Sequence, residues 1–572
     1  MTPGYQAQAN RIFACLYRSV TRIHYRYNSR NGRNVRRLSV LFIAVSFITA
    51  SCVGNASLWG QYTTPTPVGG VPWTPTPQPA VVLSDTPTPT EPFVVEESST
   101  FTPVPTVTPE VLPTQEVAPV LLESTSTSPP AAPTILYYTQ SGDWLPAVAK
   151  RFDVDVSEIT SPNVLPENGM LDTGTLLMIP DRRDNAVQYV PAIQLLPDSE
   201  VVYSATSLDL DVPAYVKEAG GFLSTYREYL KSTGWTSGAG VIERIALENS
   251  VNPRLLLALL DYEARWVRGT PENKFRTEYP LGHENFRNKG MFLQLSWGAN
   301  QIARGYYRWR NGTLTELEFR DGEKLRLEPS LNAGTVGLMY FFSLTHSLNE
   351  WLRIMDQTSG FSSFYQNMFG DPWSRAERIG PLFPPGFSQP ELNLPFETDS
   401  PWAFTGGPHS AWEHDGPLAA LDFAPAASKT GCNATPTWIL ASAPGLVVRS
   451  WNGIVVVDLD GDGKEQTGWN LLYLHVAGKD RVAEGQWVEA NDPIGHASCE
   501  GGISTGTHLH FARKYNGEWI TADGPVPFVL SGWTAVAGEK PYEGKLVKGN
   551  RVITADLYGQ LRALIYREPD GD

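Results

Sequence analysis

The segment GISTGTHLHFARKYNG, residues 502–517, decides the fold of the C-terminal part of this 572-residue chain. A glycine-rich turn leads into a run with β-branched and aromatic neighbours, which predicts a β-strand through His508 and His510. Residues two apart in a strand face the same side of the sheet. Both imidazoles are therefore expected to project into one cleft, as a metal ligand and a neighbouring catalytic group would.

Working outward from this strand, six of the nine histidines lie between positions 409 and 510. The segment FTGGPHSAWEHDGPLAALDFAP, residues 404–425, holds His409, His414 and Asp422, and NLLYLHVAG, residues 470–478, holds His475. Between them, GLVVRSWNGIVVVDLD (445–460) and the stretch from Val482 to Gly495 carry β-branched residues between glycine-rich turns. These signals predict an all-β unit.

The histidines and the aspartate together fit a catalytic zinc site. Such a site has three protein ligands and keeps a fourth position for water, and here the set is His409, Asp422 and His510. His475 and His508, if neutral near pH 7, could take up a proton and stabilise an oxyanion. His409 follows a GGP turn and is our choice for the first ligand. His414, which lies nearer to the aspartate, remains the alternative.

This unit resembles the LytM/lysostaphin-type zinc endopeptidases, which cut peptide cross-links in bacterial cell walls. The resemblance rests on LDFAP around Asp422, YLH at His475, the VxxGQxV hairpin, and STGTHLHF. The long spacing between first histidine and aspartate resembles the staphylolytic and beta-lytic branch. The resemblance implies zinc ligation by His510, catalysis by His508, and a peptidase domain at 395–537. The tail, 538–572, shows strand-like runs to which we assign no chemistry.

Two further features of this unit concern cysteines and an acidic turn. Cys432 and Cys499 are expected to form a disulfide in an exported protein, with two buried thiols as the alternative. The DLDGDG turn resembles the first half of an EF-hand loop, but Trp469 stands where a bidentate Glu is needed. An acidic hairpin turn is our preferred interpretation. Weak Ca²⁺ binding is the alternative, through Asp458, Asp460 and Asp462.

A smaller module is predicted at 135–182. Leu145, Val148, Ala149 and Phe152 recur at helical spacing after a Gly-Asp turn, a second short helix follows, and YYTQ and LLMIP are strand-like. This β-α-α-β pattern resembles the LysM domain, which binds glycans that contain N-acetylglucosamine.

The middle of the chain, 205–392, has helical patterns, strongest in GVIERIALENSVNPRLLLALLDYEARWV. Asn252-Pro253 predicts a helix start, and Glu263 falls near the end of that helix. The segment resembles the all-α lysozyme-like fold of lytic transglycosylases, in which one Glu is catalytic. Ala264 replaces the usual Ser, and Gln294 lies further along than is typical. Glu263 is therefore a candidate general acid or, alternatively, part of a glycan-holding or spacer domain.

The N-terminal segments predict export. Residues 1–37 hold eight Arg and no acid, an apolar run from Leu38 to Ala50 follows, and together they resemble a signal peptide over residues 1–51. Cys52 follows small residues, as in a lipobox, so a lipid anchor in the membrane is expected. Of the 46 Pro in the chain, 17 lie between positions 60 and 134. This composition predicts a disordered Pro/Thr-rich linker over residues 52–134.

The sequence thus predicts a multidomain cell-envelope protein. It joins a LysM module, a lysozyme-like domain and a LytM-type peptidase. The formal charge of −15 argues against nucleic acid as a partner and leaves peptidoglycan as the expected one. The expected function is a zinc endopeptidase acting on stem or cross-bridge peptides. The alternatives are a non-enzymatic scaffold or amidase activator, and a lytic transglycosylase that acts through Glu263.

Overall fold

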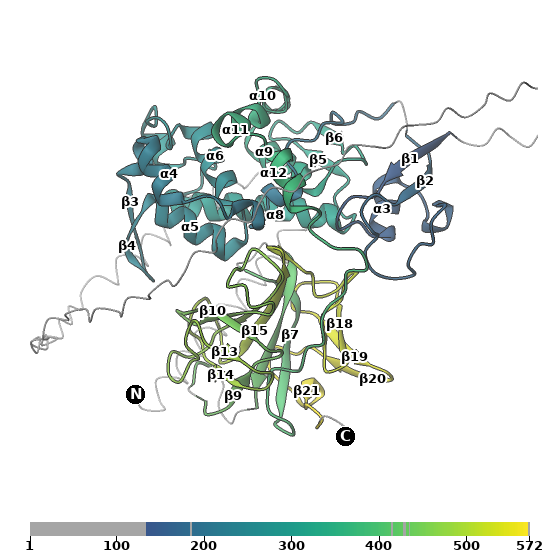
Figure 1. The fold of residues 1–572 in the computed structure, drawn as a ribbon, viewed down its shortest axis with the longest axis vertical. Helices are drawn as coiled ribbons and strands as arrows, with labels where there is room; N and C mark the ends of the chain where they lie inside the picture. Colours follow the sequence, from purple (N-terminus) through teal and green to yellow (C-terminus); the bar gives the residue numbers. More distant parts are fainter. Residues whose placement is uncertain (1–132, 184–185, 413–415, 427–430, 434, 570–572) are drawn as a thin grey trace, which may run out of the picture. The chain divides into compact units, whose positions relative to one another are not determined.

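The computed structural model describes residues 133–183, 186–412, 416–426, 431–433 and 435–569 (Figure 1). These residues belong to one compact unit of the chain, Val120–Asp572. The predicted signal peptide, Cys52 and nearly all of the linker lie outside the described residues, as does His414. Among the described helices, none is long and apolar enough to span a membrane.

The first module contains strand β1 (Thr134–Tyr138), helix α3 (Leu145–Phe152) and strand β2 (Leu176–Pro180), with the two strands antiparallel. The predicted helix and the strand at LLMIP are confirmed, whereas the strand predicted at YYTQ begins earlier, at Thr134, and ends at Tyr138. The second predicted helix is only a single 3₁₀ turn, η1 (Val156–Glu158). It stops there because Thr160 forms a β-bridge with Met178 and draws the chain back to the sheet.

Asp143 holds this module together. Its carboxylate accepts a hydrogen bond of 2.6 Å from the Tyr137 hydroxyl and pairs with Arg151 at 2.7 Å, and all three side chains are buried. Gly142 precedes it with φ +84°, a conformation that favours glycine. The Gly-Asp turn of the sequence is therefore a structural element, since it places a fully paired charge under α3.

The middle region is mainly helical. Its helices are α4 (Val212–Ala219), α5 (Gly238–Asn249), α6 (Pro253–Ala264), α7 (Lys274–Glu278), α8 (Met291–Arg310), α9 (Ala333–Thr345), α10 (Leu348–Ile354), α11 (Phe361–Phe369) and α12 (Pro372–Ile379). Single 3₁₀ turns are η2 (Asp198–Glu200), η3 (Ala205–Ser207), η4 (Phe222–Ser224) and η5 (Phe286–Asn288).

The predicted start of α6 is confirmed, because Pro253 occupies its first turn and the Asn252 side chain accepts a hydrogen bond from the Arg254 amide. The region is not all-α as predicted. It contains two short antiparallel hairpins, β3 (Arg227–Leu230) with β4 (Gly234–Ser237), and β5 (Glu316–Glu318) with β6 (Lys324–Arg326). Glycines at positive φ turn both hairpins, Gly234 at +70° and Gly322 at +86°.

The C-terminal region is β-structured, as predicted. Its strands are β7 (Trp402–Ser410), β8 (Leu418–Pro425), β9 (Trp438–Leu440), β10 (Gly445–Trp451), β11 (Ile454–Asp458), β12 (Trp469–Leu474), β13 (Trp487–Val488), β14 (Pro493–His496), β15 (Leu509–Tyr515), β16 (Glu518–Trp519), β17 (Val529–Leu530), β18 (Trp533–Ala537), β19 (Gly544–Lys548), β20 (Arg551–Thr554) and β21 (Leu564–Ile565). A 3₁₀ turn, η6 (Leu561–Ala563), precedes the last strand.

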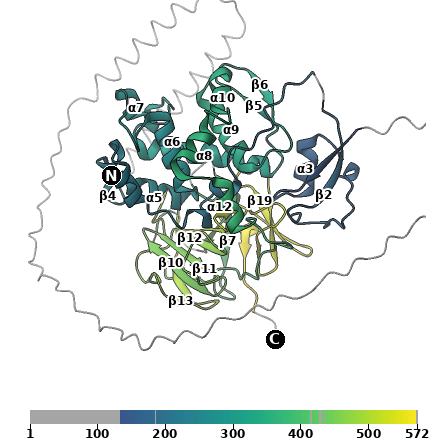
Figure 2. The ribbon, with the colours of Figure 1, turned by 45° about the horizontal axis from the view of Figure 1, so that its top comes forward.

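The main sheet runs in the order β13-β10-β11-β12-β15-β8-β7-β21, with β16 paired to β15. In the turned view of Figure 2, β10, β11, β12 and β13 lie beside one another. The sheet is apolar on both faces. Val455 and Val457 pack in a cluster within the β region, whereas Ile454 and Val456 join the apolar cluster of the helical region. The uninterrupted IVVV run of β11 follows from this burial on both faces.

The tail predicted at 538–572 is continuous with the β region. Strand β18 pairs with β19 across the predicted boundary at residue 537, and β21 pairs with β7. The Gly407 amide donates to the Tyr542 carbonyl at 2.8 Å, and the Tyr542 amide donates to the Pro408 carbonyl at 3.2 Å. These contacts place the tail directly beside the strand that carries His409.

Candidate metal centre

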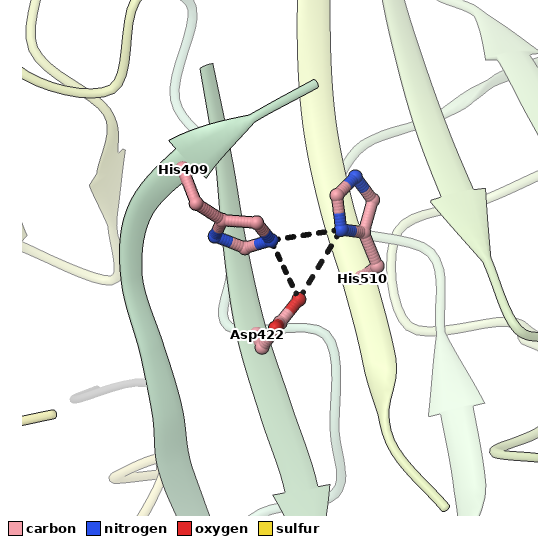
Figure 3. Close-up of side chains that lie close together, drawn as sticks. All are labelled: His409, Asp422 and His510. Carbon is pink, nitrogen blue, oxygen red and sulfur yellow. Dashed lines mark hydrogen bonds and ion pairs between the residues drawn. The ribbon is translucent and has the colours of Figure 1, made fainter. Parts of the chain in front are cut away.

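Three strands bring His409, Asp422 and His510 together (Figure 3). His510 on β15 lies opposite Asp422 on β8, so the two side chains share a face of the sheet. The Asp422 Oδ1 atom is 3.1 Å from His409 Nε2 and 3.2 Å from His510 Nδ1, and the two nitrogens are 3.0 Å apart. All three side chains are buried.

The GGP turn before His409 is explained by close packing on both sides. A Cβ atom on Gly406 would meet Asp422 Oδ2 at 2.7 Å, and one on Gly407 would meet the Glu543 carbonyl at 2.5 Å. Register shifts in β7 at these glycines then pair His409 with Ala420 of β8. Only glycine leaves room here for the carboxylate to approach the imidazole.

Backbone carbonyls fix both histidine tautomers. His409 Nδ1–H donates to the Gly407 carbonyl at 2.8 Å, and His510 Nε2–H donates to the Ala411 carbonyl at 3.0 Å. In the neutral rings, the lone pairs of His409 Nε2 and His510 Nδ1 therefore face each other and the carboxylate. Asp422 Oδ1 is itself a buried atom without a hydrogen-bond partner among the described residues. Three converging acceptors without a proton between them fit a bound cation.

The electrostatics of this group favour positive charge. Burial alone would raise the pKa of Asp422, but without a bound cation a proton on His409 and its attraction to the carboxylate hold that pKa well below its ordinary value. Two nitrogens and one carboxylate oxygen form a donor set that suits Zn²⁺, because catalytic zinc takes three protein ligands and keeps its fourth position for water. The residues present therefore fit the metal that the sequence predicts.

The two other predicted histidines lie next to this group. His475 follows β12 at φ +67°, and its ring centroid is 4.5 Å from that of His508. His508 Nε2 is 3.7 Å from Asp422 Oδ1. Each ring donates through Nδ1–H to a carbonyl at 2.8 Å, His475 to Glu500 and His508 to Gly506. Both Nε2 atoms are thereby left as proton acceptors.

Burial and the neighbouring His508 lower the pKa of His475 to about 3. The ring is therefore neutral over the physiological range, as a proton acceptor must be. The structure brings His475 and His508 together beside the ligand group, while their catalytic role stays a prediction.

The structure pairs Cys432 with Cys499, as predicted, with their Cα atoms 5.8 Å apart. The bridge joins residues 431–433 to the loop between β14 and β15. The Thr507 hydroxyl donates to the Asn433 carbonyl at 2.7 Å, and the Asn433 amide donates back to that hydroxyl at 3.0 Å. The disulfide and these hydrogen bonds hold the loop immediately before the HLH strand.

Removing the disulfide with a Cys432→Ser/Cys499→Ser double variant is expected to cost about 2–4 kcal/mol of unfolding free energy. The bridge closes a loop of 67 residues, which restricts the unfolded chain strongly. Urea unfolding followed by tryptophan fluorescence measures this loss. An unchanged midpoint would show that the bridge contributes nothing to stability.

Tyr542 is a site residue that sequence analysis missed. Its ring stacks on His409 with centroids 4.1 Å apart, and burial and the Asp422 charge raise its pKa. It comes from the tail to which no chemistry was assigned. Nothing in its sequence neighbourhood signals this position, because the contact depends on how the tail packs along β7.

Among the described residues, the remaining histidines do not belong to the ligand group. His496 packs on Trp438 with ring centroids 3.9 Å apart. His283 stacks on Trp297 at 4.0 Å in the helical region. His414, the alternative first ligand, lies outside the described residues, so the geometry speaks only for His409.

Glu263 is buried near the end of α6. Its Oε2 is 3.3 Å from Arg276 Nη1, and its Oε1 is 3.5 Å from His346 Nε2. Burial raises its pKa to about 7 against the opposing effect of Arg276. Gln294 is fully buried and donates to two carbonyls, of His283 at 2.8 Å and Asn288 at 2.7 Å, so it holds a loop.

Comparison with known proteins assigns two families to parts of this chain. Residues 429–522 match the model of Peptidase family M23, and residues 194–382 match that of the LasA N-terminal domain. The M23 match includes His475, His508 and His510, while His409 and Asp422 precede it. The LasA match covers most of the region predicted to be lysozyme-like, and the lysozyme-like resemblance itself stays a prediction.

Individual relatives agree with these assignments. Protease LasA of Pseudomonas aeruginosa is 26% identical over 361 residues, which cover 59% of this chain and 77% of LasA. The Beta-lytic metalloendopeptidase of Lysobacter enzymogenes is 26% identical over 159 residues, 27% of this chain and 83% of that protein. The solved structure of the M23 metalloprotease pseudoalterin has 22% identity and a TM-score of 0.25, covering 32% of this chain and 99% of its own. The two family matches themselves assign a metallopeptidase domain of family M23 to residues 429–522 and, ahead of it, a LasA-type N-terminal domain to residues 194–382.

Proposed function

We propose that this chain is an exported zinc endopeptidase that hydrolyses stem or cross-bridge peptides of peptidoglycan. One observation carries the proposal: His409 Nε2, His510 Nδ1 and Asp422 Oδ1 converge within 3.2 Å of one another, and the histidine tautomers leave lone pairs facing inward. A relative named as a metalloendopeptidase supports the same chemistry.

In this proposal, His409, Asp422 and His510 hold the zinc ion. When bound, zinc supplies Lewis-acid polarisation of the scissile carbonyl and increases the acidity of water. The carbonyls of Gly407 and Ala411 keep the two imidazoles in the ligating tautomer and orientation.

His475 and His508 would move protons during hydrolysis. In each ring Nδ1–H donates to a carbonyl, so Nε2 is positioned to accept a proton from attacking water and return it to the departing amine. Protonated, either ring can also stabilise the negative charge that develops on the carbonyl oxygen. The disulfide between Cys432 and Cys499 helps to hold the loop before His508 in this geometry.

The other modules would deliver the peptidase to its substrate. The first module, β1–α3–β2, is proposed to bind glycan as a LysM domain, with Leu136 and Tyr138 exposed on β1. Binding of one part of the wall raises the local concentration of the rest around the active site. A lipid on Cys52 would tether the chain to the membrane through the linker. The disulfide suits the oxidising setting of an exported protein.

Chelation tests this proposal. Treating the full chain with a zinc chelator is expected to lower the release of soluble fragments from purified peptidoglycan at least 100-fold, and equimolar Zn²⁺ should restore it. Turbidity loss of the wall suspension measures the rate, and chelator removed by dialysis without added metal is the control. Full activity in the chelator would contradict a metal-dependent reaction and direct attention to Glu263, whose raised pKa would suit a general acid.

A further inference from the structure

The turn between β11 and β12 gathers three carboxylates that the proposed peptidase chemistry does not use. Asp458 ends β11, and Asp460 and Asp462 follow in the DLDGDG turn. One carboxylate oxygen from each lies within 4.8 Å of the other two. Asp458 is fully buried, whereas Asp460 and Asp462 are exposed, so the three residues lead from the interior to the surface.

Asp458 carries a buried oxygen without a hydrogen-bond partner among the described residues. Its Oδ2 accepts the Gly463 amide at 2.8 Å, which folds the turn over the carboxylate, while Oδ1 is enclosed and unpaired. Burying a carboxylate oxygen in this way is unfavourable unless a proton or a cation compensates. Burial and the adjacent Asp460 and Asp462 raise the pKa of Asp458 to about 6.

The nearby cationic side chains are engaged with another acid. Arg449 Nε and Lys514 Nζ pair with the buried Glu465 at 2.9 and 2.7 Å. Lys464 reaches only the outer carboxylate, Asp462, at 3.6 Å from a half-exposed position. The ion pairs among the described residues of this hairpin therefore leave the charge of Asp458 and Asp460 uncompensated.

The backbone of the turn is shaped around these carboxylates. Gly461 and Gly463 have φ of +72° and +81°, and a Cβ on Gly468 would meet Asp460 Oδ2 at 2.1 Å. The Thr467 hydroxyl donates to Asp462 Oδ2 at 2.7 Å. Acids at alternate positions followed by glycine are how calcium loops present their first oxygen ligands.

We infer that Asp458, Asp460 and Asp462 bind Ca²⁺, with loop carbonyls and water completing the coordination. Trp469 occupies the position of the bidentate Glu in an EF-hand, so fewer protein ligands are present. The expected Kd is therefore in the weak range of extracellular calcium modules, about 10⁻⁴–10⁻³ M. The ion would fasten the turn that leads through β12 to His475, and the inference does not depend on peptidase activity.

Thermal unfolding of the full chain tests this inference. The protein is kept in micromolar Zn²⁺, depleted of other divalent ions, and titrated with CaCl₂ against NaCl of equal ionic strength. We expect 10 mM Ca²⁺ to raise the unfolding midpoint by about 3 °C, with half of the effect near 1 mM or below. The absence of a calcium-specific shift, or an equal shift with Mg²⁺, would overturn the calcium assignment.

The Asp460→Asn variant makes the test sharper, because Ca²⁺ should reverse the order in which the variant and the native chain unfold. Without Ca²⁺ it should unfold no earlier than the native chain, because one of three repelling charges is gone. With 10 mM Ca²⁺ it should gain nothing and unfold first. Glu391→Gln, which removes an exposed acid elsewhere, is the matched control and should keep the full calcium shift. A calcium response retained in Asp460→Asn would refute the site.

Discussion

Substituting His510 by alanine is expected to lower peptidoglycan hydrolysis about 10³-fold or more and to abolish tight zinc binding. The side chain supplies Nδ1, 3.2 Å from Asp422 Oδ1 and 3.0 Å from His409 Nε2, so its loss leaves two protein ligands where a catalytic site uses three. A factor of 10³ corresponds to about 4 kcal/mol of transition-state stabilisation. Fragment release measures the rate, and elemental analysis after dialysis measures bound zinc.

The matched control for this variant is His496→Ala. His496 lies in the same β region but stacks on Trp438 and takes no part in the ligand group. We expect it to keep zinc and to hydrolyse peptidoglycan at close to the native rate. Native activity and one bound zinc in the His510→Ala variant would contradict the assigned ligand set.

A His475→Ala variant should lose activity while it keeps its zinc. His475 is outside the group of three converging ligand atoms, and its ring centroid is 6.3 Å from that of His510. Removing a general base or acid lowers kcat by about 10²–10⁴-fold. Full zinc content with a low kcat would distinguish a role in proton transfer from a role in metal binding, because the His510→Ala variant is expected to lose both zinc and activity.

Two outcomes would speak against this role of His475. Loss of zinc together with activity would make the residue a ligand or a structural support of the ligands. An unchanged kcat would show that His508 alone transfers the proton. Its Nε2 lies 3.7 Å from Asp422 Oδ1. A far-ultraviolet circular dichroism spectrum like that of the native chain would show that the variant is folded.

The candidate site could largely be predicted from the sequence because strand periodicity is a local property. The two-residue spacing of His508 and His510 brings both rings to the same carboxylate oxygen, at 3.7 and 3.2 Å. The choice between His409 and His414 could not be derived in this way. It depends on the register shifts in β7 around Gly406 and Gly407, and those follow from tertiary packing against Asp422 and the tail.

The features that sequence patterns did not reveal are long-range contacts. Tyr542 reaches His409 from 133 positions further along the chain, through pairing of the tail with the edge of β7. The hairpins β3–β4 and β5–β6 interrupt a region with strong helical periodicity. Their strands have only three or four residues, too few for an alternating pattern to stand out.

Mass spectrometry of purified peptidoglycan digested by the full chain, with and without a zinc chelator, tests the central claim most directly. The account predicts soluble fragments with new peptide amino termini that disappear in the chelator, and the sequence around those termini identifies the bond that is cut. Anhydro-sugar ends that persist in the chelator would contradict it and give the catalytic role to Glu263. An intact wall that still binds the protein would also contradict it, and would make the chain a scaffold.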